Sequence, residues 1–305
     1  MNCNENLYSN CKLCPRECGA DRIGDKRGFC GEGSKMRIAR AALHFWEEPC
    51  LSGAEDDGRG SGTVFFSGCT MRCVYCQNGD IACGEVGREI TAERLEEIFH
   101  ELEAKGAYNI NLVTPDCFIP EIAAAVRNAK ESGFALPFVF NVSGYEKVET
   151  LRMLEGLCDI WLTDYRYNEE KPARLYSAAG DYPEVARAAI AEMVRQKPKP
   201  VYGADGMLKE GVIVRQLLLP GHLRNSRGAV KYLHETYGEN IIISLMSQYT
   251  PTGKTGFSEL ERTVTEAEYD AFVRYALDLG IENAYVQDGA SAKESFIPAF
   301  DYEGV

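Results

Sequence analysis

Short apolar runs alternate with amphipathic stretches along most of this chain, from Thr63 to its C-terminal part. The apolar runs have the length of strands and lie at residues 63–67, 109–114, 137–142, 158–164, 211–218, 240–246 and 284–287. Between them, apolar residues recur with helical spacing at residues 91–105, 120–132, 146–155, 182–196, 226–237 and 265–279. Strands that alternate with helices in this way predict a parallel α/β sheet.

The number of strand–helix pairs narrows the choice of architecture. About six pairs are too few for a closed barrel of eight units. We therefore expect an α/β fold, a partial (β/α)6 TIM-like barrel that is open on one side to a bulky substrate. A doubly wound open sheet has the same local pattern, and periodicity does not separate the two.

Changes in composition predict four parts in the chain. An N-terminal cysteine-rich segment occupies residues 1–52, and a glycine-rich, acidic linker follows at 53–62. The barrel is expected at 63–290 and a C-terminal tail at 291–305. The first part is rich in cysteine and shows little periodicity.

Charge and hydropathy exclude several classes of partner. The 305 residues carry a formal net charge of -13 and no block rich in Lys or Arg, which argues against binding nucleic acid. No run approaches the roughly 20 apolar residues of a membrane span, so no membrane association is expected. The polar N-terminus lacks the apolar core of a signal peptide, which predicts a cytoplasmic protein. Its 12 cysteines should then be mostly reduced thiols or metal ligands.

Three cysteines directly after the first apolar run carry the clearest chemical signal. Cys69, Cys73 and Cys76 have the spacing Cys-x3-Cys-x2-Cys. Thiolates this close together on one loop can hold three irons of a 4Fe-4S cluster. The fourth iron then has an open position for a small molecule, as in catalytic metal sites. Tyr75, next to the last cysteine, offers a flat ring on which an adenine can stack.

A second group of cysteines lies in the N-terminal segment. Cys11, Cys14, Cys18 and Cys30 supply four thiolates in a stretch that is too short to bury much core. A bound metal would help to order it. The irregular spacing suits a second iron–sulfur cluster, whereas structural zinc more often uses two Cys-x2-Cys pairs. A zinc site and free thiols both remain open at this point.

The cysteine loop with Tyr75 resembles the signature of the radical S-adenosylmethionine (radical SAM) superfamily. Nearly the whole chain is similar to the branch related to pyruvate formate-lyase activating enzyme. The resembling segments are Cys11–Gly19, His44–Cys50, Cys73–Asn78, Asn109–Pro115 and Ser244–Pro251.

This resemblance implies an enzyme with a 4Fe-4S cluster and S-adenosyl-L-methionine as cofactors. The reduced cluster would cleave the sulfonium and release a 5′-deoxyadenosyl radical, which abstracts hydrogen from an unknown substrate. Reduced flavodoxin or ferredoxin is implied as electron donor. A glycyl-radical protein is one implied protein substrate, and direct modification of a peptide or small molecule competes with it.

Polar residues at the ends of the expected strands are candidates to bind the cosubstrate. The carboxyl ends of parallel strands are where ligands bind in such folds. We expect the methionine and ribose groups to be held from this set: Asn111, Thr114, Asn141, Ser143, Asp164 and Arg215. Arg215 suits a carboxylate because guanidinium pairs with it bidentately. A buried structural ion pair is the alternative role for Arg215.

Two departures from the family pattern limit what the resemblance implies. Many relatives carry a Gly-Gly-Glu motif after the second strand, but Asn111–Pro115 occupies that region here, so the contact to the methionine ammonium must differ. Activating enzymes often add cluster cysteines after the first triad, where this chain has only Cys83. The departures leave open whether the resemblance reflects ancestry or activating-enzyme activity. A non-enzymatic iron–sulfur electron-transfer or metal-binding protein that uses both cysteine groups is the alternative function, and the sequence identifies no catalytic residue.

Overall fold

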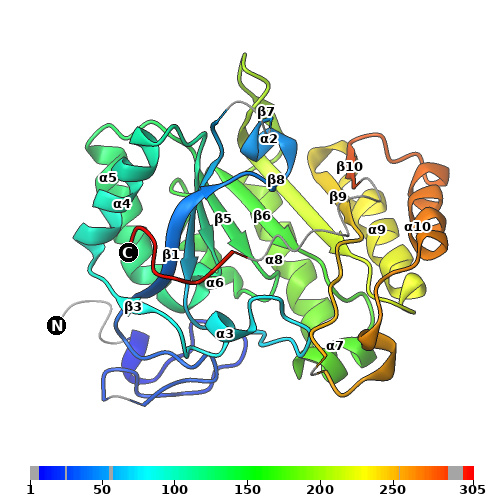
Figure 1. Cartoon of the computed structure of the whole chain (residues 1–305), viewed down its shortest axis with the longest axis horizontal. Helices are drawn as coiled ribbons and strands as arrows, with labels where there is room; N and C mark the ends of the chain where they lie inside the picture. The colour runs from blue at the N-terminus through cyan, green and yellow to red at the C-terminus, as the bar shows by residue number, and fades with distance from the viewer. Residues whose placement is uncertain (1–6, 25, 55–57, 254, 288–297) are drawn as a thin grey trace.

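The computed structural model describes residues 7–24, 26–54, 58–253, 255–287 and 298–305. A single ten-stranded sheet forms the centre of this part of the chain (Figure 1). Its strands follow the order β10-β9-β8-β6-β5-β4-β2-β1-β3, and β7 pairs with β8. The strands are β1 Arg37–His44, β2 Ser61–Phe66, β3 Arg88–Glu89, β4 Ile110–Val113, β5 Phe138–Val142, β6 Ile160–Asp164, β7 Val201–Tyr202, β8 Leu208–Leu217, β9 Ile242–Met246 and β10 Ala284–Val286.

Helices connect the parallel strands of this sheet. The α-helices are α2 Pro49–Ser52, α3 Gly79–Ala82, α4 Ala92–Ala104, α5 Ile119–Glu131, α6 Val148–Arg152, α7 Glu170–Ser177, α8 Tyr182–Gln196, α9 Leu223–Tyr237 and α10 Glu266–Asp278. Short 3-10 turns are η1 Pro115–Phe118, η2 Gly238–Asn240 and η3 Ser258–Glu261. Strands β2, β4, β5, β6, β8, β9 and β10 all pair in parallel. The predicted partial (β/α)6 arrangement is therefore confirmed.

Local sequence explains why these elements form. Every residue of β2, β4 and β5 is buried, which accounts for their continuous apolar runs. Helix α4 begins after Thr91, whose side chain accepts a hydrogen bond from the Arg94 amide. Helix α10 begins with a capping box formed by Thr265 and Glu268.

Strand β1 is an element that the sequence pattern does not predict. It runs antiparallel to β2 and extends the sheet beyond the barrel strands. Its sequence, Arg-Ile-Ala-Arg-Ala-Ala-Leu-His, is rich in alanine, which strands normally disfavour. After β1 the chain passes under the barrel, where Cys50 and Leu51 of α2 pack against Val139, Ile160 and Ile213. Residues 49–52 thus form the floor of the barrel, at the end opposite α3 (Figure 1).

The C-terminal residues cover the outer side of β1. The Ala41 amide donates to the carbonyl of Glu303 at 2.8 Å, and the Tyr302 amide donates to Ala39 at 3.1 Å. Arg40 also forms ion pairs with Asp301 and Glu303. These contacts satisfy backbone groups that an edge strand would otherwise expose.

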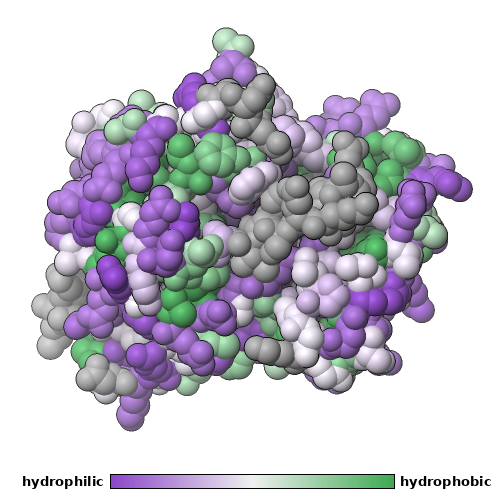
Figure 2. Space-filling view, in the orientation of Figure 1, coloured by the Kyte–Doolittle hydropathy of each residue, from purple (hydrophilic) through white to green (hydrophobic). Residues whose placement is uncertain are grey.

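The surface is mixed in character. Polar and charged side chains cover most of the face seen in Figure 2, around apolar ones near its centre. No helix in the described ranges is long and apolar enough to cross a membrane.

Candidate functional site

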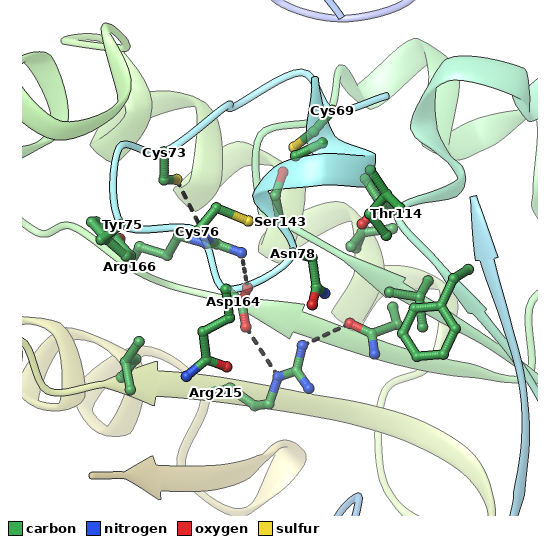
Figure 3. Close-up of a pocket in the computed structure, with 18 of the residues that line it drawn as sticks. Cys69, Cys73, Tyr75, Cys76, Asn78, Thr114, Ser143, Asp164, Arg166 and Arg215 are labelled. Atoms are coloured by element: carbon green, nitrogen blue, oxygen red, sulfur yellow. Dashed lines mark hydrogen bonds and ion pairs between the residues drawn. The ribbon is translucent and has the colours of Figure 1, made fainter. Parts of the chain in front are cut away.

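A cavity of about 250 Å³ opens at the carboxyl ends of the parallel strands. The cysteine loop lies on one side of it and the ends of β4, β5, β6 and β8 lie on the other (Figure 3). Most of the residues predicted for the site line this cavity: Cys69, Cys73, Tyr75, Cys76, Thr114, Asn141, Ser143, Asp164 and Arg215. Parallel strands end at one edge of a sheet, which explains why residues so distant in sequence meet here.

The cysteine loop forms a tight turn between β2 and α3, and two of its residues have positive φ angles. Gly68 has φ +81°, and a Cβ there would lie 2.4 Å from Glu32 Cγ, so this position requires glycine. Arg72, between the first two cysteines, also has a positive φ of 48°. Burial raises the pKa of Cys69 to about 12 and that of Cys76 to about 11. Buried thiols of this kind become thiolates when iron supplies the opposite charge, so the donor set fits an iron–sulfur cluster.

Two side chains donate hydrogen bonds to the sulfur of Cys73. Arg166 Nη1 lies 3.3 Å from Cys73 Sγ, and Ser177 Oγ lies 3.0 Å from it. Hydrogen bonds to a ligating sulfur orient it and tune the potential of the bound centre. Neither donor is predicted from the sequence, because both reach the loop from β6–α8 connections more than 90 residues away.

Tyr75 lines the cavity, but its hydroxyl is also engaged. It lies 2.8 Å from the hydroxyl of Tyr167, which lies 2.7 Å from Ser177 Oγ. Since Ser177 donates to Cys73, a chain of hydrogen bonds runs from Tyr75 back to the cysteine loop. The ring of Tyr75 meets Tyr176 and Tyr249 edge to face.

Thr114 occupies a strained position at the end of β4. It has φ 56°, a left-handed conformation that is rare for a β-branched residue. Its amide is fixed by the carbonyl of Asn141 at 2.9 Å. Strain of this kind is often kept at functional sites, which agrees with the place of Thr114 at the cavity wall.

Arg215 sits in a buried ion-pair network below the cysteine loop. Its guanidinium donates to Asp164 Oδ1 at 3.0 Å, to Asn141 Oδ1 at 2.6 Å and to Glu47 Oε2 at 3.4 Å. Burial raises the pKa of Asp164, but the guanidiniums of Arg166 and Arg215 outweigh burial and lower it overall. The structural ion pair considered for Arg215 is thus present, and its role toward a cosubstrate stays a prediction.

Glu47 is a cavity residue that the sequence analysis did not select. Asn111, which was predicted to hold the cosubstrate but does not line the cavity, donates to Glu47 Oε1 at 3.0 Å. Burial raises the pKa of Glu47 despite the nearby Arg215. The resemblance of His44–Cys50 to the family was the sequence signal that could have indicated Glu47. Its position beneath β4 could not be predicted from the sequence.

Comparisons with known proteins agree with this geometry. Residues 57–182 match the family model of a 4Fe-4S single cluster domain. A radical SAM methyltransferase from Sphaerobacter thermophilus superposes with a TM-score of 0.53 and 16% identity, covering 74% of this chain and 66% of that chain. The chain has the partial-barrel fold of radical SAM proteins. The doubly wound sheet considered from the sequence is therefore not the fold.

Two further proteins are similar to this chain, one in structure and one in sequence. SuiB from Streptococcus suis, solved with the precursor peptide SuiA, has a TM-score of 0.50 and 12% identity, covering 72% of this chain and 46% of SuiB. An uncharacterised protein from Methanocaldococcus jannaschii is 26% identical over 287 residues, covering 90% of this chain and 78% of that protein. This chain thus spans less than two thirds of the length of either structural relative.

A buried pair of carboxyl groups, Asp116 and Glu146, lies beside this cavity. Ser143 donates through its amide (3.1 Å) and its hydroxyl (2.9 Å) to Glu146 Oε1. Among the described residues, no donor reaches Glu146 Oε2 or either oxygen of Asp116. Burial raises the pKa of Asp116 to about 7, and burial and the charge of Asp116 raise the pKa of Glu146. One proton shared by the two carboxyls would join one oxygen of Asp116 to one of Glu146.

This pair predicts a specific dependence of stability on pH. Unfolded Asp116 loses its proton near pH 4, whereas the folded protein keeps it to about pH 7. Folding therefore binds a proton between about pH 4 and pH 7, and stability falls as pH rises through this window. We expect Asp116→Asn to flatten the decline of Tm over this range. The control Asp205→Asn should not, because hydrogen bonding to Lys209 lowers the pKa of that exposed carboxyl. An unchanged slope in Asp116→Asn would contradict the shared proton.

The N-terminal segment is fastened to the cysteine loop by Arg16. Its guanidinium donates to the carbonyl oxygens of Thr70 at 2.9 Å, Ser177 at 2.7 Å and Ala178 at 2.5 Å. It also lies 4.1 Å from the centre of the Phe29 ring. The segment that carries the second cysteine group therefore packs directly on the site, at the same end of the sheet as α3 (Figure 1).

The four cysteines of the second group differ in their burial. Cys11 and Cys30 are buried, Cys14 is half-buried and Cys18 is exposed. In the part of the chain that the structure describes, no group of three or more His, Cys, Asp or Glu side chains could hold a single metal ion. This finding supports neither the second iron–sulfur cluster nor the zinc site considered from the sequence.

Proposed function

We propose that this protein is a radical SAM enzyme. The observation that carries the proposal is the loop with Cys69, Cys73 and Cys76 at the mouth of a polar cavity, in a fold of the radical SAM type. A 4Fe-4S cluster bound there would supply one electron to S-adenosylmethionine, giving methionine and a 5′-deoxyadenosyl radical that takes a hydrogen atom from the substrate.

The residues of this chain would hold the cofactors and keep water away. Cys69, Cys73 and Cys76 supply thiolates, and Arg166 and Ser177 orient the Cys73 sulfur. The floor at residues 49–52 closes the barrel below the site, which protects a reactive radical from solvent.

The cavity walls offer contacts for both ends of the cosubstrate. Thr114, Asn141 and Asp164 line the cavity, and they would hold polar groups of methionine and ribose. Glu47 is the carboxylate available for the methionine ammonium, because the Gly-Gly-Glu motif of many relatives is replaced here by Asn111–Pro115. Glu47 also forms an ion pair with Arg215, which pairs with Asp164 as well.

Binding of S-adenosylmethionine separates this function from its alternative. The anaerobic protein, reconstituted with iron and sulfide, should bind the cosubstrate and form 5′-deoxyadenosine when reduced with dithionite. A non-enzymatic iron–sulfur electron-transfer or metal-binding protein would carry the cluster without either property. A reconstituted protein that neither binds nor cleaves the cosubstrate would favour that alternative.

Within this function we favour a peptide or protein as the substrate. SuiB, which shares the fold, was solved with a precursor peptide, and the activating-enzyme resemblance also implies a protein substrate. Activation of a glycyl-radical protein in the cytoplasm, with flavodoxin or ferredoxin as electron donor, is the finer form of this proposal. Transfer of deuterium from labelled candidate substrates into 5′-deoxyadenosine tests it directly.

The ring of Tyr75 gives a graded prediction for cosubstrate binding. Stacking of a base on an aromatic ring is worth about 1–3 kcal/mol. Tyr75→Ala should therefore weaken S-adenosylmethionine binding by roughly fivefold to 150-fold. Tyr75→Phe keeps the ring and loses only the bond to Tyr167, so its affinity should stay close to that of the parent. Affinities are compared on folded variants with equal iron content, and tight binding by the Ala variant would refute the stacking role.

A further inference from the structure

A buried guanidinium in the N-terminal segment has an unusual environment. Arg22 is 1% exposed, and it donates to the carbonyl oxygen of Gly33 at 2.9 Å and 2.5 Å. Its guanidinium lies 4.2 Å from the centre of the Tyr8 ring. None of the carboxylates in the described residues forms an ion pair with Arg22. A buried charge is normally balanced by an opposite charge, so the balancing groups must be other side chains nearby.

Besides Tyr8, those side chains are cysteines. Arg22 Nη1 lies 3.8 Å from Cys11 Sγ, and Cys30 is among the groups that interact with its charge. The sulfurs of Cys18 and Cys30 approach each other across Gly28, 3.2 Å and 3.5 Å from the place that a Cβ would take there. Glycine at this position keeps the space between the two sulfurs free of a side chain.

We propose that Cys11, Cys14, Cys18 and Cys30 ligate a second iron–sulfur cluster whose negative charge is balanced by Arg22. Cys14 lies within electrostatic reach of the other three thiols, which completes the set of four. Four thiolates are the usual ligands of a 4Fe-4S cluster. This centre is independent of S-adenosylmethionine cleavage, because it uses none of the cavity residues.

The arrangement favours a cluster over a single zinc ion. The described residues hold no group of three thiols that could meet at one ion. The same is true of Cys69, Cys73 and Cys76, as expected when each thiolate serves a different iron. The spacing Cys-x2-Cys-x3-Cys also departs from the paired Cys-x2-Cys of structural zinc.

The surroundings give this cluster a structural role in the whole molecule. Cys117 of η1 hydrogen-bonds Cys30, which links the segment to the barrel. Arg16, between Cys14 and Cys18, donates to the carbonyl oxygen of Thr70 in the cysteine loop. A metal that orders a core-poor segment contributes its binding free energy to folding.

The test removes the first cluster and counts the iron that remains. A Cys69→Ala/Cys73→Ala/Cys76→Ala variant, reconstituted anaerobically with iron and sulfide, should retain about four iron and four sulfide per chain. It should also give the electron paramagnetic resonance signal of a reduced cluster. Adding Cys14→Ala and Cys18→Ala, neither of which is fully buried, should abolish both. Adding Cys158→Ala instead, at a buried cysteine outside both groups, should leave iron and signal unchanged.

Three outcomes would overturn the proposal. They are a folded triple variant without iron, a variant that holds zinc instead, and iron that survives Cys14→Ala/Cys18→Ala. Circular dichroism establishes folding. Should the triple variant not fold, Cys14→Ala/Cys18→Ala in the otherwise unchanged chain serves as the second measurement. Its iron should fall from about eight to about four per chain, and iron that does not fall would contradict the second cluster. Because S-adenosylmethionine is absent from these assays, their failure is distinct from failure of the proposed enzyme function.

Discussion

Cys73→Ala should abolish the formation of 5′-deoxyadenosine from S-adenosylmethionine by the reduced, reconstituted protein. Among the three loop cysteines, Cys73 is the one whose sulfur accepts hydrogen bonds from both Arg166 and Ser177. Under the proposed function, its loss would remove one iron ligand and leave the half-buried Arg166 with one partner fewer. Product is measured by chromatography after a fixed time with excess dithionite.

The control for this result is a thiol of similar burial outside the site. Cys158 is fully buried and its sulfur contacts the carbonyl of Ile160, far from the cavity lining. Cys158→Ala should keep product formation close to that of the parent. Near-normal product from Cys73→Ala would mean that the loop does not hold the catalytic cluster.

Arg215→Met should destabilise the protein by about 3–5 kcal/mol, the usual cost of leaving a buried ion pair with one member. The carboxylates of Asp164 and Glu47 both form ion pairs with the Arg215 guanidinium, and the substitution removes this partner from each of them. Asp164 keeps Arg166 as a second partner, which places the expected loss toward the lower end. Chemical denaturation at neutral pH measures the change in free energy of unfolding.

A surface pair provides the matched comparison. Arg174 pairs with Glu170 one helical turn away, and both side chains are more than half exposed. Arg174→Met should cost at most about 1 kcal/mol, because exposed ion pairs contribute little. Adding Glu47→Gln to Arg215→Met should restore part of the lost stability, because it removes the carboxylate charge that Arg215→Met leaves without a partner. Equal losses for Arg215→Met and Arg174→Met would show that the network is not a buried charge pair.

The sequence predicts the barrel well because its strands are buried and its helices amphipathic. Those two patterns have different periods, so the parallel strands and most of the helices could be located before the fold was known. Helix α7 and the short strand β7 were not predicted. The convergence of Asn141, Asp164 and Arg215 was also predictable, because parallel strands place their carboxyl ends together. Strand β1 was not, because its alanine-rich sequence has no strand-like period.

The contacts that shape the site depend on tertiary structure, which local patterns do not encode. Arg166 reaches Cys73 across 93 positions of sequence, and Arg16 reaches Ser177 across 161. Glu47 meets Asn111 because the chain turns under the barrel after β1. In each case the residue type indicated a polar role, but its partner could be named only from the fold.

The path of residues 37–52 decides how this protein can be shortened or grafted in the laboratory. A fragment that starts at Thr63 would keep most of the parallel sheet. It would lose β1, which pairs with β2, the floor residues Cys50 and Leu51, and the carboxylate of Glu47. The smallest fragment that keeps these parts therefore begins no later than Arg37, well before the glycine-rich stretch where the sequence suggests a boundary.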